Sequence, residues 1–433
     1  MGSFAIPLSG LTAAQDDLQS VSNNLANINT DGYKDENLTF SDLFSQAGGT
    51  NGSGDPLQTG SGVAVASTTS NFTEGTLDAT GTTSNMALSG NGFFVTQGAN
   101  GLPDYTRAGD FTTNNAGQLT TPDGQLLLGY PAVNGVVNAS AALGPMQVGS
   151  VTSPAVTTKN LQITANLDAG ATLGTSGATT TSSLAVFDSL GGSHTLALSY
   201  TMTAPNTWSY AATVPNADLS TGGAGVTTIA SGTLNFNSSG VLISTEPTGG
   251  TATAAPSAGI TLTIPPTTTP ATTFTDGAAP MSVNWNLLDG SGNSTMTQTA
   301  TAGTTSATSQ DGFASGSLSS YAVQPNGTIV GTFSSGTSLA LGQVAVATFG
   351  NVEGLTSIGN NNYQPTAASG SAVVGAAGTG GRGTIVGGSV EQSNVDIAAE
   401  FAKLIVAQQA YSANAKSITT FNQVSQATLA MIQ

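Results

Sequence analysis

The sequence predicts a mainly β protein with long α-helices at its two ends, organised as a discontinuous multidomain chain. Apolar residues repeat in steps of three and four near each end, as they do in helices that pack against helices. The residues between these ends are rich in Thr, Ser, Gly, Ala and Val, with short apolar runs bounded by turn residues. We therefore expect the N- and C-terminal helices to pair as a coiled-coil-like inner domain, with β-rich middle and outer domains between them.

The N-terminal helix is expected over residues 9–29. Its apolar stripe keeps an unbroken a/d register, which comprises Leu11, Ala14, Leu18, Val21, Leu25 and Ile28. Ser9 is placed to cap the start of the helix, and Gly32 is available for a left-handed turn at its end.

The C-terminal helix is expected over residues 394–432, with Ser393 as its N-cap and Asp396 completing a capping-box-like pair. Its apolar stripe comprises Ile397, Phe401, Leu404, Gln408, Tyr411, Ala415 and Ile418. We expect the two stripes to be an assembly interface, because neither has a partner beside it in the sequence. An isolated helix of about 20 residues is marginal in water, so both ends are expected to be disordered in the monomer and to fold on assembly.

Changes in composition divide the chain into four parts. They are a helical inner domain (1–33 and 388–433), a linker segment (34–70), a β-rich middle domain (71–150 and 306–387) and an inserted all-β outer domain (151–305). Hairpin signals occur at Asn91–Gly92 and Asp123–Gly124. The tract 261–275 contains three prolines, so it fits an edge strand or a loop better than a central strand.

Charge and composition exclude several classes of protein. The 433 residues carry 6 Lys+Arg and 23 Asp+Glu, for a formal net charge of -17. Nucleic-acid binding needs clustered basic residues, and docking to anionic membranes needs them too, so we expect neither partner. The chain has no cysteine, which removes disulfides, thiolate zinc sites and cysteine nucleophiles. We also expect no membrane insertion and no cleaved secretory signal at residues 1–10.

Three features suggest chemistry, and each has a simpler interpretation. Residues 378–383 match G-x-G-x-x-G without the strand and helix of a dinucleotide site, so we interpret them as a glycine linker. His194 and Asp188 are interpreted as a hairpin turn capped by the aspartate rather than a catalytic pair, and one histidine argues against a transition-metal site. Paired carboxylates for glycoside hydrolysis meet only in the fold, but turns explain many of the acids. We expect no enzymatic activity and no catalytic, cofactor-binding or metal-binding residues.

Four stretches resemble the flagellar rod and hook (axial) protein family of bacteria. Residues 22–34 (SNNLANINTDGYK) are similar to the N-terminal signature of this family, and residues 391–416 to its C-terminal signature. Residues 88–95 (LSGNGFFV) and 105–111 (YTRAGDF) match the β-domain that the family shares. The motif residues taken from this resemblance are Asn23, Asn24, Asn27, Gly32, Tyr33, Gly92, Phe93, Phe94, Arg107, Ser393, Asn394, Asp396 and Asn414. Arg107, one of the few basic residues, is expected to make a structural ion pair or an intersubunit contact.

Within this family the hook proteins are the closer match, because rod proteins usually lack a large insertion. Residues 186–194 (VFDSLGGSH), 208–210, 312–316 and 331–336 resemble the outer domain of hook proteins, whereas 215–305 shows no such resemblance. The resemblance implies a structural subunit that polymerises with copies of itself into a curved helical tube and transmits motor torque to the filament. It also implies rod, hook-cap and hook–filament junction proteins as partners, with type III export to the outside of the cell without a cleaved signal.

Two alternatives stay open from the sequence. The nearer one is another axial component, such as a distal rod or hook–filament junction protein. The more remote one is a secreted β-rich adhesin or an enzyme acting on polysaccharide, which would have no need of the terminal stripes.

Overall fold

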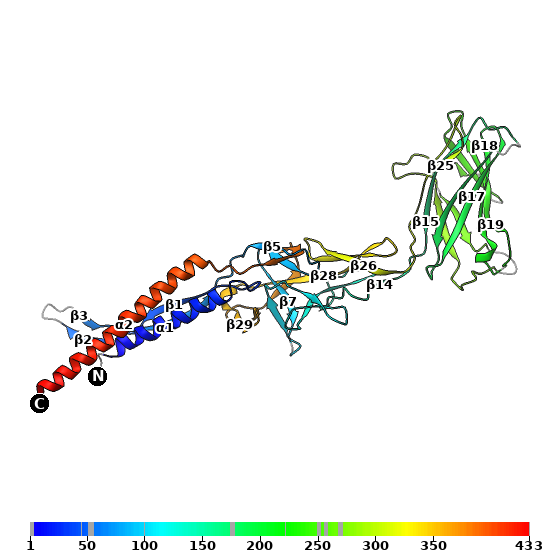
Figure 1. Ribbon diagram of the computed structural model, residues 1–433. Coiled ribbons are helices and arrows are strands. Elements are labelled where there is room, and N and C mark those ends of the chain that lie inside the picture. Colours follow the sequence, from blue (N-terminus) through cyan, green and yellow to red (C-terminus); the bar gives the residue numbers. More distant parts are fainter. Residues whose placement is uncertain are drawn as a thin grey trace. The chain divides into compact units, whose positions relative to one another are not determined.

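The computed structural model describes residues 4–44, 46–50, 56–98, 100–173, 178–220, 222–248, 253–254, 259–266 and 272–432. The chain forms two compact units. The first, which we call the terminal unit, comprises Met1–Ser150, Ser320–Gly331 and Leu339–Gln433; the second, the outer unit, comprises Val151–Ser319 and Thr332–Ser338. The predicted fold class, mainly β with paired terminal helices, is confirmed (Figure 1).

The two long helices are α1 (Ala5–Ala26) and α2 (Ile397–Ile432), and they lie side by side in the terminal unit (Figure 1). They run antiparallel, because Phe4 at the start of α1 contacts Phe421 late in α2, while Asn24 near the end of α1 contacts Glu400 in the first turn of α2. Each stripe, which has no partner beside it in the sequence, thus finds one within the same chain, against the expectation that the two ends fold only on assembly.

Helix α1 differs from the predicted helix at both ends. It begins at Ala5 with no side-chain cap, and Ser9 lies inside it, where its hydroxyl donates to the Ile6 carbonyl. The predicted Ser9 cap is thus wrong. The helix ends at Ala26, so Ile28 lies beyond it. Gly32 does adopt the predicted left-handed conformation, with φ of 70°.

Helix α2 begins three residues later than predicted, and its N-cap is Asp396. The Asp396 carboxylate accepts hydrogen bonds from the amides of Ala398 and Ala399 at 2.8 and 3.2 Å. Such a bond satisfies amides that the first turn leaves without partners. Ser393 is not the cap, since its hydroxyl accepts from the Val395 amide outside the helix.

Residues 34–70, expected to be a linker, carry β-structure. Strands β1 (Glu36–Asp42) and β4 (Val63–Ser70) form an antiparallel ladder that packs along α1, and β2 (Gln46–Thr50) pairs with β3 (Pro56–Thr59). The amide of Val63 donates to the Ser9 hydroxyl, which ties this ladder to the helix. The Gly- and Asn-rich composition at 48–62 concealed the strands on either side.

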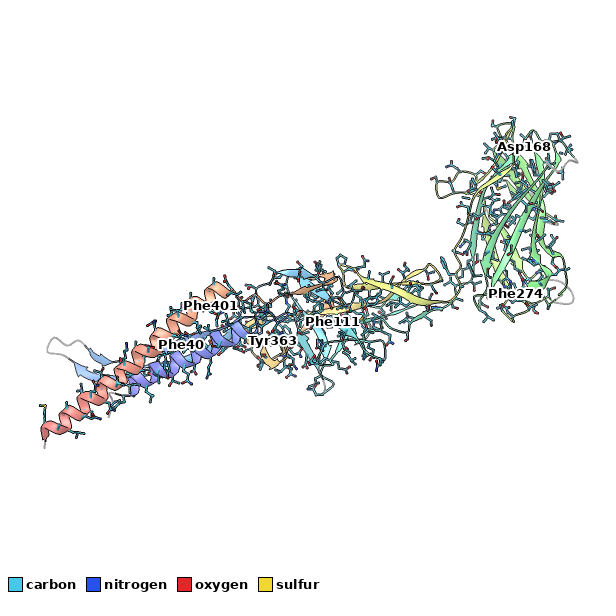
Figure 2. The ribbon with its side chains drawn as sticks, viewed as in Figure 1. Phe40, Phe111, Asp168, Phe274, Tyr363 and Phe401 are labelled. Carbon is cyan, nitrogen blue, oxygen red and sulfur yellow. The ribbon has the colours of Figure 1, made fainter. Side chains whose placement is uncertain are left out.

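The β part of the terminal unit is built around one large sheet, which contains the strand order β28-β11-β7-β8-β30-β29 and ends at β29. Phe93 and Phe94 of β7 point to opposite faces and enter two separate hydrophobic clusters, so this strand is buried on both sides. Phe111 lies in one cluster and Tyr363 in the other (Figure 2). The strands of this part are β5 (Leu77–Ala79), β6 (Met86–Ser89), β7 (Phe93–Gln97), β8 (Pro103–Thr106), β9 (Thr112–Thr113), β10 (Leu119–Thr120), β11 (Leu126–Val133), β12 (Val136–Val137), β13 (Gly144–Pro145), β28 (Ser338–Thr348), β29 (Thr356–Gly359), β30 (Asn362–Gln364), β31 (Val373–Ala376), β32 (Thr384–Gly387) and β33 (Ser389–Glu391).

The glycine-rich residues 378–383 form the turn between β31 and β32. The amide of Gly378 donates to the carbonyl of Gly383 at 2.9 Å, and no helix follows the turn. The segment is therefore a connection between two strands, as interpreted from the sequence.

The outer unit contains a six-stranded sheet, β16-β17-β18-β19-β20-β21, and a five-stranded sheet, β22-β23-β15-β24 with β25 on β15. Buried and outward-facing residues alternate along β16 and β18, as expected for strands with one face on a core. The two sheets share that core, where Tyr210 packs edge-on against Trp285 at 5.5 Å between ring centroids. The strand β22, in the proline-containing tract, is an edge strand.

The strands of the outer unit, with β26 and β27, which like β28 cross its boundary, are as follows: β14 (Thr152–Ser153), β15 (Asn160–Asp168), β16 (Thr179–Phe187), β17 (Ser193–Ala204), β18 (Thr207–Pro215), β19 (Val226–Phe236), β20 (Leu242–Pro247), β21 (Thr253–Ala254), β22 (Ile260–Ile264), β23 (Met281–Asn286), β24 (Met296–Thr299), β25 (Thr304–Gln310), β26 (Gly316–Val323) and β27 (Thr328–Phe333). The outer unit thus extends beyond residue 305, where the insertion was expected to end.

Candidate assembly interface

The face of α1 that meets α2 combines small, polar and apolar residues. Ala14 and Val21 of the predicted stripe are buried, while Leu11, Leu18 and Leu25 are half-buried. Gly10 allows the closest approach, because a Cβ there would lie 2.9 Å from the Asn414 side-chain nitrogen. The family-motif residue Asn414 therefore has a structural role in the helix pair.

The stripe predicted for α2 is only partly correct. Leu404, Ala415 and Ile418 are half-buried, but Ile397, Phe401 and Tyr411 are 53%, 48% and 38% exposed, and Gln408 is also exposed. The residues of α2 that are buried or half-buried on heptad spacing instead are Glu400, Ala407 and Asn414. The register is displaced because close helix contact selects small residues and hydrogen-bonding partners, which an apolar pattern does not reveal.

A second apolar face of α2 is therefore left uncovered. This face carries Ile397, Phe401 and Ile405, which follow one another in steps of four residues and remain about half exposed. The other large apolar side chains of α2 that are more than a third exposed lie around the helix, and they are Val406, Tyr411, Phe421, Val424, Leu429 and Met431. Figure 2 shows Phe401, which belongs to this face, on α2. Exposed apolar surface of this extent is typical of interaction sites rather than of solvated helix faces.

Charged groups add specificity where the helices meet. The Lys403 ammonium donates to Glu400 at 2.6 Å and to the Asn37 side chain at 3.0 Å, and Glu400 accepts from Asn24 at 3.3 Å. Burial raises the pKa of the nearby Asp17 carboxyl, Lys403 opposes this shift, and Glu400 adds to it. Helix α1, helix α2 and strand β1 are thus joined through one polar network.

A buried ion triad joins the N-terminal segment, the β part and the C-terminal segment of the terminal unit. Glu391 is fully buried and lies 2.6 Å from Lys34 Nζ and 3.2 Å from an Arg107 nitrogen. Arg107 thereby makes an intrachain ion pair, one of the two roles expected for it. Burial lowers the pKa of Lys34, and the charge of Glu391 opposes that shift. Removing one member of such a triad strongly lowers the stability of the folded state, because the remaining charges stay buried without compensation.

Sequence reasoning missed Lys34 and Glu391 as site residues. Both lie inside the stretches that resemble family signatures, and the chain has only six basic residues, so a lysine there was a usable signal. What could not be read from the sequence is that residues 34, 107 and 391 meet, because their sequence separation gives no indication of contact.

Other motif residues lie around this triad and fix the chain at the same place. Asn394 accepts from the Asp35 amide at 2.9 Å and donates to the Asn71 carbonyl at 2.8 Å. The Tyr33 hydroxyl donates to Asn24 at 3.0 Å, and burial raises the pKa of Tyr33 to about 12. The motif therefore positions α1 and α2 relative to the strands within the terminal unit.

Three further motif residues, Asn23, Asn27 and Gly92, make structural contacts. Asn23 and Asn27 hydrogen-bond to each other at the end of α1. Gly92 has φ of 134° and leaves no room for a side chain beside Val346, so only glycine suits this turn. These residues shape the terminal unit and offer no group for chemistry.

Four family models match successive parts of the chain. They are described as flagella basal body rod protein (residues 6–34), flagellar hook protein FlgE/F/G D1 domain (87–168), flagellar basal body protein FlaE D2 domain (158–313) and flagellar basal body rod FlgEFG protein C-terminal (386–431).

Full-length relatives agree with these models. The chain is 34% identical over 433 residues to the flagellar hook protein FlgE of Salmonella typhimurium, with 98% of each chain covered. This chain belongs to the flagellar hook protein family. It is also 33% identical to the hook protein FlgE of Escherichia coli over 435 residues and 32% identical to that of Borreliella burgdorferi over 456 residues, with 97% and 98% of this chain covered.

A crystal structure of Helicobacter pylori flagellar hook protein FlgE2 aligns with 73% of this chain and 100% of its own, at 15% identity and a TM-score of 0.49. Within the described residues, neither α1 nor α2 has the run of apolar residues that crossing a bilayer requires.

Proposed function

We propose that this chain is the structural subunit of a bacterial flagellar hook. Many copies assemble into a curved helical tube outside the cell, which passes motor torque to the filament as a flexible joint in motility. The chain belongs to the hook protein family over nearly its whole length, and this supports the proposal. The family is structural, so we propose no enzymatic activity.

The observation that carries the proposal is the uncovered apolar face of α2. One side of the helix is occupied by α1, yet side chains such as Ile397, Phe401 and Ile405 remain about half exposed. Burying them against a neighbouring copy gains roughly 25 cal/mol per Å² of apolar surface removed from water. A head-to-tail contact of this kind between identical chains is heterologous, and repeating it builds an open helix.

The proposed assembly partners and export route follow from the assignment of this chain as a hook subunit. Rod, hook-cap and hook–filament junction proteins would meet the two ends of the tube, and the type III apparatus would export the subunit without a cleaved signal. The match of both chain ends to models described as basal body rod proteins supports an axial partner of similar construction. The full-length relatives are hook proteins, which favours the hook over a distal rod, a junction component, an adhesin or a polysaccharide enzyme.

The test is polymerisation of the purified full-length chain. Under salting-out conditions, electron microscopy should show tubes formed by the unmodified protein. The substitution Phe401→Asp places a charge on the uncovered face of α2 and should abolish tubes while leaving the monomer folded, as judged by circular dichroism. Leu102→Asp is the matched control, because Leu102 is 60% exposed on a loop between β7 and β8 and should tolerate the charge.

Normal tubes from Phe401→Asp would overturn the role assigned to this face. Absence of tubes from the unmodified chain at every salt concentration, with a monodisperse folded monomer, would overturn the hook assignment itself.

A further inference from the structure

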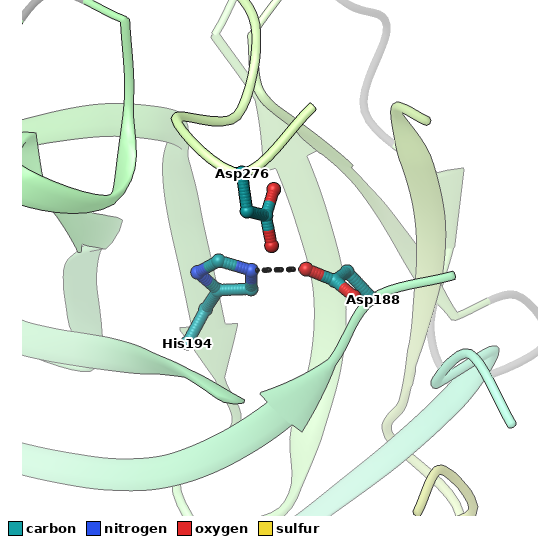
Figure 3. Close-up of side chains that lie close together, drawn as sticks. All are labelled: Asp188, His194 and Asp276. Atoms are coloured by element: carbon teal, nitrogen blue, oxygen red, sulfur yellow. Dashed lines mark hydrogen bonds and ion pairs between the residues drawn. The ribbon is translucent and has the colours of Figure 1, made fainter. Parts of the chain in front are cut away.

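The single histidine of the chain lies in a cluster of carboxylates at one end of the outer unit. His194 Nε2 lies 2.8 Å from Asp188 Oδ2, and one ligand atom from each of Asp188, His194 and Asp276 converges within 4.8 Å (Figure 3). The predicted hairpin turn is confirmed: Asp188 Oδ1 accepts from the amides of Leu190 and Gly192. Because those amides occupy Oδ1, the other oxygen is free to face the histidine.

A third aspartate approaches the other ring nitrogen. Asp218 Oδ2 lies 3.3 Å from His194 Nδ1, without the alignment of a hydrogen bond. His194 and Asp188 are buried, whereas the Asp218 side chain is partly exposed and Asp276 is exposed. One imidazolium would balance only one of three carboxylates, and no ion pair among the described residues brings a lysine or arginine to them.

The surroundings hold these groups in place and leave space between them. The Phe274 ring stacks on His194 at 4.4 Å between centroids, and this fixes the plane of the imidazole. A side chain on Gly192 would begin 2.5 Å from Asp188 Oδ2 and 2.7 Å from Asp276 Oδ2. Glycine at this position therefore keeps open the space beside both oxygens.

We propose that Asp188, His194 and Asp276 bind a divalent first-row transition-metal ion such as Zn²⁺. Imidazole nitrogen with carboxylate oxygens is a donor set suited to zinc, at about 2.0–2.2 Å from each ligand atom. Ligands of one ion then lie about 3 to 4 Å apart, so the three ligand atoms, which already lie within 4.8 Å of one another, need only small shifts. Asp276 is on the solvent side, where water completes the coordination.

Asp218 acts as the positioning residue of this site. With the ion on Nε2, the imidazole proton resides on Nδ1, which faces Asp218. A carboxylate that accepts from the second nitrogen of a metal-bound histidine fixes its tautomer and orientation. The sequence contains one histidine and predicts no metal site, whereas the fold brings carboxylates to that histidine.

The ion joins separate parts of the outer unit. Asp188 and His194 border the hairpin between β16 and β17, whereas Asp276 lies in the turn after Phe274, and the Thr275 amide donates to the Asp218 carbonyl. Binding to the folded state alone stabilises that state in proportion to the logarithm of ion concentration. The site does not rest on the hook assignment and can be tested on the monomer.

The test uses tag-free full-length protein, so that His194 is the only imidazole present. Zn²⁺ is titrated by calorimetry in a large excess of Mg²⁺, which occupies non-specific acidic sites. We expect one ion per chain and displacement of the His194 Nε2 resonance in long-range ¹H–¹⁵N spectra. Asp276→Asn, an exposed and therefore well-tolerated change, should weaken binding at least about 10-fold, and Asp218→Asn by about 10-fold.

The matched control is Asp289→Asn, in another turn of the same unit whose carboxylate accepts from the amides of Ser291 and Asn293. This variant should bind as the unmodified chain does. Absence of saturable binding, equal binding by Asp276→Asn, or an unshifted Nε2 resonance would each overturn the proposal. Tryptophan fluorescence verifies that each variant is folded, because Trp208 and Trp285 both lie in the core of the outer unit.

Discussion

The helix pair and the outer unit differ in how far they bury their apolar side chains within one chain. In the outer unit, two sheets enclose a continuous core that contains both tryptophans, while hydroxyl side chains face outward along the strands. In α2, which has 36 residues, Glu400 and Ala407 are the buried side chains among those described, and large apolar groups face outward. One region completes its hydrophobic core within a single chain, whereas the other leaves apolar surface for a neighbouring copy.

This difference separates stability from assembly. A β unit with a closed core and a charge-poor surface can meet its neighbours through exchangeable, hydrated polar contacts. We propose that the helix pair instead gains much of its burial from other copies. The following predictions test that division, beginning with the largest effect.

Removing a central ring from the outer core should unfold that unit without disturbing the helices. We expect Trp285→Ala to destabilise the outer unit by about 3–5 kcal/mol, since the indole is fully buried between the sheets. Urea denaturation followed by the fluorescence of Trp208 measures the loss, and ellipticity at the helical minimum reports α1 and α2. Thr201→Ala, on the outward face of β17, should change stability by about 0.5 kcal/mol or less. Parallel loss of helicity would contradict independent stability of the two regions.

Enlarging a side chain in the contact between α1 and α2 should lower the stability of the helix pair by an intermediate amount. Ala407 is 1% exposed, so Ala407→Leu forces apart closely packed helices at a cost of about 1–3 kcal/mol. Thermal unfolding followed by circular dichroism should show a lower midpoint for the helical signal and an unchanged tryptophan signal. Ala413→Leu changes an exposed position of the same helix and should leave the midpoint nearly unchanged. If both variants behaved alike, the register seen for α2 would be refuted.

Lowering the pH should change the folding stability of the two units in opposite directions, and by less than the core and helix-contact variants do. Burial raises the pKa of three carboxyls of the terminal unit, Asp17, Asp31 and Asp110. Three carboxyls of the outer unit, Asp188, Asp289 and Asp311, have lowered pKa values. In Asp188 and Asp311, burial alone would raise the pKa, but hydrogen bonds to the carboxylate outweigh burial. In Asp289, hydrogen bonds from backbone amides, chiefly that of Asn293, lower the pKa.

The direction of each effect follows from which state binds the proton more tightly. A raised pKa means that the folded state takes up the proton first, so the terminal unit gains stability as the pH falls toward the ordinary value of 3.8. A lowered pKa means that the outer unit loses stability as the pH falls below 3.8 through the folded value. Urea midpoints from neutral pH to about pH 3, read by fluorescence and circular dichroism with a chelator present, check both signs. If the midpoints from the two signals shifted in the same direction with pH, the opposite pH dependence predicted for the two units would be contradicted.

The sequence was a reliable guide where a pattern is local. The heptad steps located both helices, because such a pattern records which side of a helix is buried. It was a poor guide to the ends of α1 and to Ser9 and Ser393. The Ser9 hydroxyl instead accepts from the Val63 amide of β4, and Asp396 rather than Ser393 caps α2.

The sequence by itself determined that the chain is a β protein with helical ends and that it resembles axial flagellar proteins, because periodicity and motif spacing are properties of neighbouring residues. Only the tertiary structure decided which face of α2 meets α1, that Lys34, Arg107 and Glu391 share one buried site, and that Asp276 approaches His194. These outcomes depend on close approach between residues far apart in the chain, where small size, hydrogen bonding and charge outweigh the apolar pattern.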